Sequence, residues 1–204
     1  MSSRIKKSQL RQKRLAVFGG TFDPPHVGHL IAARAVRHAC DIDRMLFMVA
    51  NQPWQKERKE MSSAEDRLAM VQAAVAGLSW CEASSLEIDR GGDSYTADTL
   101  EQLAEEMPDW DLFVVIGSDI VAHLNTWKRP DVIKRLAEMV VVERPGSVGL
   151  DLPDGWVGKR VEGKLVDISS TQLRKWIRLG RPTEDILPAG VAEVITVRGL
   201  YSAF

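Results

Sequence analysis

The stretch LAVFGGTFDPPHVGH, residues 15–29, decides the fold. It begins with four apolar residues, continues with two glycines and two prolines, and ends with two histidines three residues apart. An apolar run followed by Gly and Pro is typical of a buried strand that ends in a tight turn. Pro24 and Pro25 stiffen this turn, and a helix is expected to begin between Val27 and His29. The stretch therefore predicts a strand–loop–helix unit.

Working outward, further apolar runs of strand length alternate with segments of helical pattern. Strands this apolar must be covered on both faces, so the pattern predicts an α/β fold with a parallel sheet between helices. Ser62 and Glu65 have the spacing of a capping box, Thr96 can cap the next helix, and Pro130 can begin another. The expected strands are LAVF at 15–18, MLFMVA at 45–50, LFVVI at 112–116, MVVVE at 139–143 and a last one around 165–168.

The carboxyl-terminal part is expected to form a small helical subregion. A loop over residues 145–156 leads to the last strand, and a helix is expected over residues 170–179. One domain over residues 14–204 is the simplest organisation for a chain of 204 residues. Residues 1–13 are basic and contain no acid, so they are expected to form a disordered tail.

Composition excludes several classes of protein. A net charge of -1 argues against a general nucleic-acid binder, which needs a positive excess to displace counterions. No apolar run approaches the roughly 20 residues of a membrane-spanning helix, so no membrane partner is expected. Cys40 and Cys81 lie far apart without metal-ligand spacing, which suits a reducing, cytoplasmic location. The sequence leaves open whether the chain forms a homo-oligomer.

The loop after the first strand has the chemistry of a phosphate site. The sequence contains neither GxxxxGK[ST] nor GxGxxG after this strand. Gly19 and Gly20 can nevertheless let a phosphate approach the backbone. His26 and His29 should share one face of the first helical turn, where the helix dipole favours an anion. A zinc pair or ordinary capping histidines are the other readings, but zinc would need further ligands that the sequence does not supply at suitable spacing.

A second anion site is expected at ISSTQLR, residues 168–174. The hydroxyls of Ser169, Ser170 and Thr171 open a helix, and Arg174 lies one turn further along. Arg174 can therefore reach the same anion. Taken alone, this pattern also fits a plain helix cap.

Together, these two motifs resemble the GxFDxxHxGH and ISSTxIR signatures of the nucleotidyltransferase superfamily, with Leu173 in place of Ile. The resemblance implies a Rossmann-like fold that binds a nucleoside triphosphate across the carboxyl ends of strands one and four. It assigns catalytic roles to His26, His29 and Arg174. The ATP-binding residues that it implies are Gly19, Gly20, Thr21, Phe22, His26, His29, Gly117, Asp119, Ser169, Ser170, Thr171 and Arg174. Asp119 is equally plausible as a helix cap.

Within the superfamily, the chain is similar to bacterial nicotinate mononucleotide adenylyltransferases. GGTFDPPHVGHL, IDRGGDSYTADTL, GSDIVAHLNTWK and VVERPG resemble blocks of these enzymes, and NQPWQK resembles their actinobacterial form. The family assigns acceptor binding to Trp127, by stacking, and to the backbone near Tyr95 and Thr96. Lys56 is a candidate cation for a phosphate. Trp127 as core and Lys56 as a solvated loop residue remain open.

The resemblance implies adenylyl transfer from ATP to nicotinate mononucleotide, a step of NAD biosynthesis. Mg²⁺ is expected on the ATP phosphates, held by the nucleotide and water, with no metal site built by the protein. Nicotinamide mononucleotide or phosphopantetheine could be the acceptor instead. The chain could also be a nucleotide-sensing module without turnover, or a protein that uses its basic tail to bind RNA or a membrane surface.

Overall fold

The computed structural model describes residues 11–53, 61–143, 151–162 and 168–202. The first strand begins at Lys13, and the side chain of Arg11 donates to Asp43 at 2.8 Å. The expected tail over residues 1–13 is therefore too long by these last residues, and residues 1–10 lie outside the described part.

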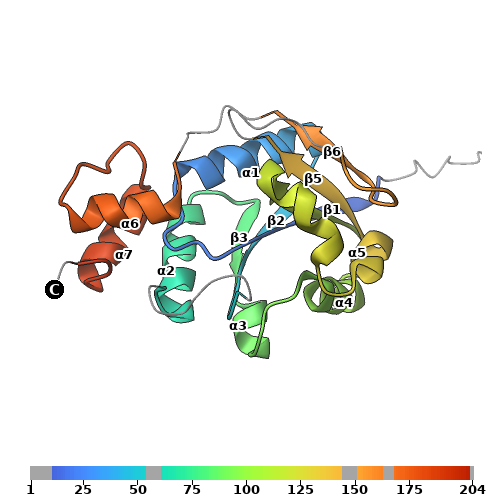
Figure 1. Cartoon of the computed structure of the whole chain (residues 1–204), viewed down its shortest axis with the longest axis horizontal. Coiled ribbons are helices and arrows are strands. Elements are labelled where there is room, and N and C mark those ends of the chain that lie inside the picture. The colour runs from blue at the N-terminus through green and yellow to red at the C-terminus, as the bar shows by residue number, and fades with distance from the viewer. Residues whose placement is uncertain (1–10, 54–60, 144–150, 163–167, 203–204) are drawn as a thin grey trace, which may run out of the picture.

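The described residues form a six-stranded sheet in which every paired neighbour is parallel, as the sequence predicts. The spatial order is β3-β2-β1-β4-β5-β6, so the direction of winding reverses between β1 and β4 (Figure 1). The carboxyl ends of the strands at such a reversal are where open α/β sheets bind ligands. The strands are β1 (Lys13–Gly20), β2 (Arg44–Val49), β3 (Cys81–Ser84), β4 (Trp110–Gly117), β5 (Ala137–Val142) and β6 (Gly158–Val161).

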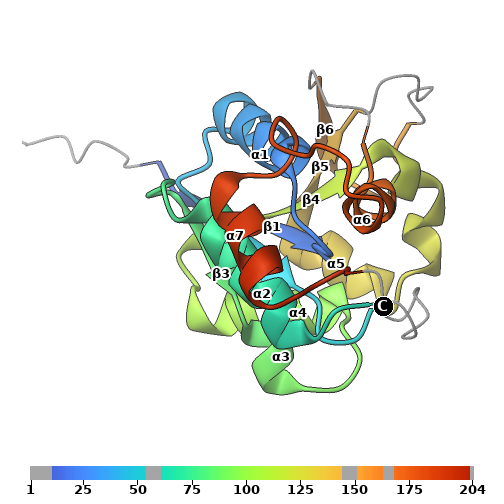
Figure 2. The same cartoon turned by 90° about the vertical axis from the view of Figure 1, so that its left-hand side faces the viewer.

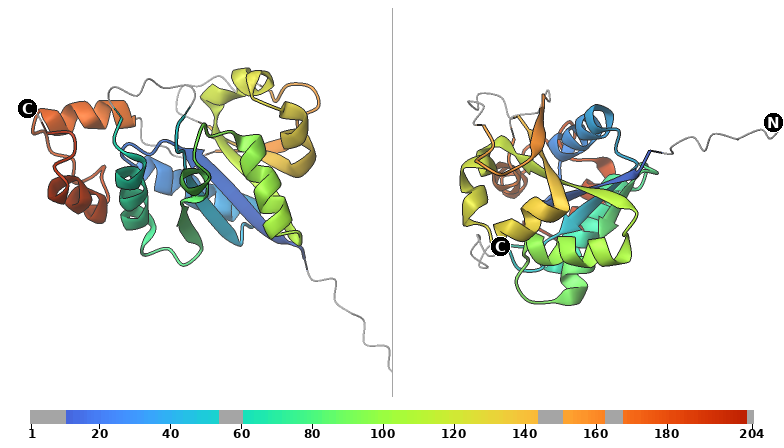
Figure 3. Two further views of the ribbon diagram at one scale, coloured as in Figure 1. Left: turned by 90° about the horizontal axis from the view of Figure 1, so that it is seen from below. Right: turned by 90° about the vertical axis from the view of Figure 1, so that its right-hand side faces the viewer.

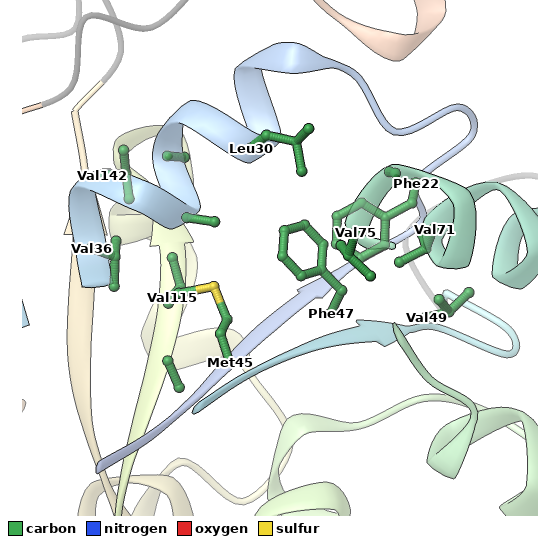
Figure 4. Close-up of a cluster of buried hydrophobic side chains, with 14 of the residues drawn as sticks. Phe22, Leu30, Val36, Met45, Phe47, Val49, Val71, Val75, Val115 and Val142 are labelled. Atoms are coloured by element: carbon green, nitrogen blue, oxygen red, sulfur yellow. The ribbon is translucent and has the colours of Figure 1, made fainter. Parts of the chain in front are cut away.

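Helices cover both faces of this sheet because successive strand residues point to opposite sides. Met45 and Phe47 of β2 pack under α1 (Val27–Cys40) and beside α2 (Ala64–Val75) (Figure 4). Leu46 and Met48 of the same strand belong to the other core. That core also contains buried side chains of α4 (Thr96–Glu106), η2 (Ser118–Thr126) and α5 (Pro130–Leu136). The short helix α3 (Leu86–Arg90) joins β3 to the segment before α4.

The carboxyl-terminal helices form the expected helical subregion. They are α6 (Ser170–Arg178) and α7 (Ala189–Val197), and they lie at one end of the molecule beyond α2 (Figure 3). Helix α7 packs against α2 (Figure 2). A Cβ at Gly190 would lie 3.3 Å from Ala73, so glycine permits the close approach of these two helices.

Two predicted helix caps need correction. The N-cap of α2 is Ser63, whose side chain accepts from the N–H of Asp66, so the predicted box at Ser62 is one residue early. Thr96 is the first residue of α4, and Tyr95 is its cap. In each case a neighbouring residue has the extended backbone that a cap requires. Pro130, by contrast, begins α5 as predicted.

The last strand is also displaced from its expected position around 165–168. Residues 163–167 lie outside the described part, and Ile168 is not in a strand. The sixth strand, β6, is GKRV at 158–161, a sequence too polar to show a strand pattern. It forms an outer strand, and a Cβ at Gly158 would come within 2.1 Å of the Met139 carbonyl oxygen. Glycine thus allows β6 to pair closely with β5.

Candidate active site

A cavity of about 440 Å³ opens at the carboxyl ends of β1 and β4. This is the point where the winding of the sheet reverses, as the resemblance predicts. Its walls come from those two strands, the loop after β1, and the first turns of α1, α4 and η2. Predicted site residues on its wall are Gly19, Gly20, Thr21, Phe22, His26, His29, Thr96, Gly117, Asp119 and Trp127.

Glycine is needed at the two last positions of β1 for different structural reasons. A Cβ at Gly19 would meet no atom within 4 Å, so its backbone faces unfilled space at the cavity. A Cβ at Gly20 would lie 2.8 Å from the ring of Phe22. Phe22 is buried and has a left-handed backbone with φ 51°, which folds the loop back over Gly20. Gly19 therefore leaves room for a ligand, whereas Gly20 leaves room for the loop itself.

His26 and His29 lie together at the start of α1. Their ring centroids are 3.8 Å apart, and both rings line the cavity. The backbone N–H of His26 donates to Nδ1 of His29 at 3.1 Å. A neutral imidazole that accepts at Nδ1 carries its proton on Nε2. The contact therefore sets His29 as a donor through Nε2.

The surroundings of these rings favour an anion. Helix α1 begins at Val27, and its first turn contains no acidic residue that could neutralise the positive end of the helix dipole. Phe22 packs edge-on to His29 at a centroid distance of 5.2 Å. An oriented imidazole donor at a helix amino terminus is suited to a phosphate oxygen.

The start of α6 binds the loop that carries His26. The hydroxyl of Ser170 donates to the Pro24 carbonyl at 2.9 Å, and Nη1 of Arg174 donates to the Asp23 carbonyl at 2.8 Å. Ser169 is the N-cap of α6 and accepts from the N–H of Gln172. The two predicted motifs are thus joined directly.

The same contacts show where the side chain of Arg174 lies in this conformation. Ile168 lines the cavity, but Ser169, Ser170, Thr171 and Arg174 are not among the described residues of its wall. The guanidinium of Arg174 faces the loop at Asp23, whose carboxylate lies 3.8 Å away. In this conformation Arg174 stabilises the loop after β1 without being part of the described cavity wall. Direct contact of these four residues with ATP stays a prediction.

Asp23 is the centre of a buried polar cluster behind the loop. One of its oxygens accepts from the hydroxyl of Tyr201 at 2.6 Å, and the other accepts from the N–H of Ser62 at 3.3 Å. Burial and the Asp23 carboxylate raise the pKa of Tyr201, so its hydroxyl stays protonated and donates at neutral pH. The cluster ties the carboxyl-terminal end of the chain to the loop after β1.

Two of the predicted acceptor residues, Thr96 and Trp127, lie on the cavity wall, and the part of the wall around them is called the acceptor end below. Trp127 is half-buried and lines the cavity, while the same residue packs on the core beside η2. Thr96 lines the cavity at the first turn of α4. Tyr95 is not on the described wall; its hydroxyl donates to Asp93, and the ammonium of Lys128 lies 3.9 Å from its ring centroid. Lys56 lies outside the described residues.

Arg129 joins the two acceptor elements. It has a left-handed backbone with φ 51° and directly follows Lys128 in the turn after Trp127. Its guanidinium forms ion pairs with Asp98 and with Glu101, both on α4. The start of α4 and the turn that contains Trp127 are thereby held together.

Comparisons with known proteins agree with this geometry. The sequence model of the cytidylyltransferase-like family matches residues 17–176. A probable nicotinate-nucleotide adenylyltransferase of Saccharopolyspora erythraea is 40% identical over 94% of this chain and 91% of its own length. The corresponding protein of Frankia casuarinae is 42% identical over 90% of this chain and 97% of its own.

The chain belongs to the nicotinate-nucleotide adenylyltransferase family. It is therefore a nucleotidyltransferase, and the family identified from its motifs is confirmed. Among solved structures, the nicotinic acid mononucleotide adenylyltransferase of Plasmodium falciparum superposes with a TM-score of 0.76. The superposition covers 93% of this chain and 97% of the Plasmodium falciparum chain, and the two sequences are 17% identical. That likeness confirms the Rossmann-like fold.

Several residues of this adenylyltransferase site escaped the sequence interpretation. Ser94, Glu87 and Thr99 line the acceptor end of the cavity. Glu87 is buried and accepts from the hydroxyl of Thr99 at 2.6 Å, and Arg90 donates to the same hydroxyl. Ser94 and Thr99 lie inside the family block IDRGGDSYTADTL, and Glu87 directly precedes it, which was their sequence signal. Their polar side chains gave no periodic pattern of their own.

The two cysteines are expected to be unreactive in the folded enzyme. Desolvation raises the pKa of Cys81 to about 12 and also raises the pKa of buried Cys40. The thiolate is the reactive form of cysteine. Because both pKa values are raised, the thiolate fraction of each cysteine is negligible near neutral pH. Treatment with iodoacetamide at pH 7.5, read by mass spectrometry, should label neither cysteine in native protein and both after denaturation. Rapid labelling of native Cys81 would contradict this reading.

Among the described helices, none has both the length and the apolar character needed to cross a membrane.

Proposed function

We propose that this chain transfers the adenylyl group of ATP to nicotinate mononucleotide, giving deamido-NAD and pyrophosphate. The observation that carries the proposal is one cavity whose wall combines two kinds of group. His26 and His29 line it at the positive end of α1. Trp127 and the start of α4 add an aromatic face and a second helix amino terminus. Relatives about 40% identical over nearly the whole chain are named for the same acceptor.

The proposed reaction is a direct displacement. A phosphate oxygen of nicotinate mononucleotide attacks the α-phosphorus of ATP and forms a new P–O bond. The bond to the bridging oxygen between the α- and β-phosphates breaks, and pyrophosphate leaves. A phosphate monoester has a second pKa near about 6, so it is mostly dianionic at neutral pH and needs no general base. The protein has to align the two substrates and stabilise negative charge as it moves to pyrophosphate.

His29 is assigned the second of these tasks. Its Nε2–H is directed by the contact of Nδ1 with the His26 backbone. A fixed donor strengthens its hydrogen bond as charge grows on the leaving oxygen, and it requires no reorganisation during the step. The dipole of α1 adds positive potential at the same place, beside the ring of His26.

The start of α4 is assigned recognition of the acceptor carboxylate. Backbone N–H groups at a helix amino terminus favour an anion. Thr96 opens this helix on the cavity wall, beside Trp127 on which a pyridine ring can stack. This arrangement favours the acid over the neutral amide of nicotinamide mononucleotide.

Magnesium is proposed to enter with ATP. No group of three or more His, Cys, Asp or Glu side chains among the described residues could hold a metal ion. The phosphates and water are assigned as its ligands, because Mg²⁺ retains several waters and is commonly bound through substrate phosphates. ATP and its acceptor are intracellular metabolites, so we place the reaction in the cytoplasm.

Trp127→Ala is expected to weaken acceptor binding selectively. Loss of the stacking face should raise the KM for nicotinate mononucleotide by about two- to tenfold, corresponding to an aromatic contact of roughly 0.5–1.5 kcal/mol. The KM for ATP should change little. Steady-state pyrophosphate release with each substrate varied in turn measures both. Trp110→Ala is the control, because Trp110 begins β4 at the end of the strand away from the cavity. An unchanged acceptor KM in Trp127→Ala would reject stacking.

An acceptor panel tests the function itself. Purified protein is incubated with ATP, Mg²⁺ and one acceptor, and pyrophosphate and the dinucleotide product are measured. Nicotinate mononucleotide should be used with the highest kcat/KM, ahead of nicotinamide mononucleotide, and phosphopantetheine should give no product. Higher kcat/KM with either of the other acceptors would overturn the assignment.

A further inference from the structure

Arg67 is a fully buried arginine that the proposed reaction does not use. It lies in the first turn of α2, and none of its surface is exposed. Its guanidinium donates to four backbone carbonyls. The acceptors are the carbonyl oxygens of Ser62 at 3.2 Å, Thr21 at 3.1 Å, Ala50 at 2.6 Å and Asn51 at 3.0 Å.

These carbonyls belong to three separate segments. Thr21 is in the loop after β1, on the wall of the cavity beside Gly20. Ala50 and Asn51 directly follow β2, and Ser62 precedes α2. Loops at strand ends have no sheet ladder to hold them, so their relative positions depend on contacts of this kind. One side chain thus fixes the ends of two neighbouring strands to the start of a helix.

Arginine is suited to this place by its shape. Its planar guanidinium has five donors in a fixed fork, whereas a lysine ammonium is a compact point charge. Burial lowers the pKa of Arg67, and the Asp23 carboxylate opposes that effect. A charged group so deeply buried is costly unless its donors are satisfied. Its four carbonyl partners argue for a specific positional role.

The network continues from Arg67 to the acceptor end of the cavity. The N–H of Asn51 donates to the hydroxyl of Ser94 at 2.8 Å, and its side-chain amide donates to the Gly92 carbonyl at 2.9 Å. The N–H of Ser94 in turn donates to the Gln52 carbonyl at 3.1 Å. Ser94 and Thr96 both line the acceptor end. Arg67 is therefore linked to the loop after β1 through Thr21. It is linked to the segment just before α4 through Asn51 and Ser94.

We propose that Arg67 is a positioning residue that sets the distance between the two substrate half-sites. This inference rests on the proposed function, because a displacement reaction needs the attacking oxygen in line with the α-phosphorus. Arg67 touches neither substrate. It acts by fixing the loop that receives the triphosphate and the segment that leads to the acceptor-binding turn.

Two substitutions test the proposal with a matched control. Arg67→Met keeps the aliphatic length and removes every donor. Arg67→Lys keeps the charge and stem but cannot span all four carbonyls. Arg198→Met is the control, because Arg198 also contacts α2, through an exposed ion pair with Asp66 at 2.7 Å away from the cavity. The measurements are kcat, both KM values, and the unfolding midpoint, with circular dichroism showing that each variant is folded at the assay temperature.

The expected result is a split between kcat and KM. In Arg67→Met, kcat should fall by about 10²-fold, the cost of an ångström-scale misplacement, while each KM changes by less than about tenfold. Arg67→Lys should lie between Arg67→Met and wild type, and Arg198→Met should stay within about twofold of wild type. A purely structural role predicts a lower unfolding midpoint with unchanged kcat in folded protein.

A kcat within about twofold of the control in folded Arg67→Met would overturn the proposal. If Arg67→Met does not fold, Arg67→Lys decides by the same criterion, since it retains the charge and part of the network. Wild-type turnover separates this test from that of the proposed function. If the wild type prefers another acceptor, the variants are compared with that acceptor, and the ratio of their kcat values still measures positioning.

Discussion

Replacing His29 by alanine is expected to lower kcat by about 10²–10³-fold, the usual cost of removing one fixed donor to developing charge. The reason is the geometry at the start of α1. The His26 backbone holds Nδ1 of His29 and directs Nε2–H as a donor. The fold should persist, because the loss of one hydrogen bond costs about 1 kcal/mol. Single-turnover and steady-state pyrophosphate release measure the defect.

His38→Ala is the matched control for this prediction. His38 is exposed in the last turn of the same helix, far from the cavity wall. Its replacement should leave kcat within about twofold of wild type. His26→Ala should show a defect of similar direction to His29→Ala, since the two rings lie together with centroids 3.8 Å apart. Near-normal kcat in both cavity variants would remove the histidines from the mechanism.

Gly19→Ala is expected to reduce kcat/KM for ATP by about 10²-fold while leaving the fold intact. A Cβ at this position meets no protein atom within 4 Å, so the protein can accommodate it. It would stand at the cavity, where a phosphate is proposed to approach the backbone. The free energy of unfolding should change by no more than about 1 kcal/mol. Thermal unfolding and ATP-dependent kinetics separate the two effects.

Gly77→Ala provides the corresponding control. A Cβ there also meets nothing within 4 Å, but Gly77 lies just after α2 and is not part of the cavity wall. Both variants should be equally stable to within about 1 kcal/mol, and only Gly19→Ala should lose activity. Full activity in Gly19→Ala would show that no ligand group approaches this part of β1.

The sequence was most informative where one segment carries several signals. The stretch from Leu15 to His29 combines an apolar run, turn residues and a helix start, and the structure confirms its strand and helix. The apolar runs of β2, β4 and β5 were predicted to within a few residues because these strands are buried on both faces. The parallel sheet and the Rossmann-like fold followed from their alternation with helices.

The outer strands were missed for the opposite reason. β3 is CEAS and β6 is GKRV, and each pairs with only one described neighbour. Outer strands are short and polar, so they lack the periodicity on which strand prediction depends. The position of β6 depends on the close approach at Gly158, a contact between segments that local sequence does not reveal.

Arg67 is a residue whose burial could have been predicted from the sequence, but whose hydrogen-bond partners could not. The buried residues of α2 are Arg67, Met70, Val71, Ala74 and Val75, which is the spacing of one helix face. A charged residue at the head of an apolar face is a signal of a buried polar network. The identity of its partners depends on three loops that meet only in the folded protein.

Arg174 illustrates the reverse case. Its spacing from Thr171 predicted a shared anion, and the side chain instead contacts the Asp23 carbonyl. Spacing along a helix places a residue on a face, but the partner of a long side chain is decided by the nearest acceptor in the fold. The motif correctly predicted which segments meet, whereas the contact of this guanidinium with an anion stays a prediction.

A crystal structure with a non-hydrolysable ATP analogue is the decisive experiment. The triphosphate is expected at the start of α1, with Nε2 of His29 within about 3.2 Å of a phosphate oxygen and the phosphates passing over Gly19. Binding of the triphosphate elsewhere, with both histidine rings out of hydrogen-bond reach, would contradict this expectation.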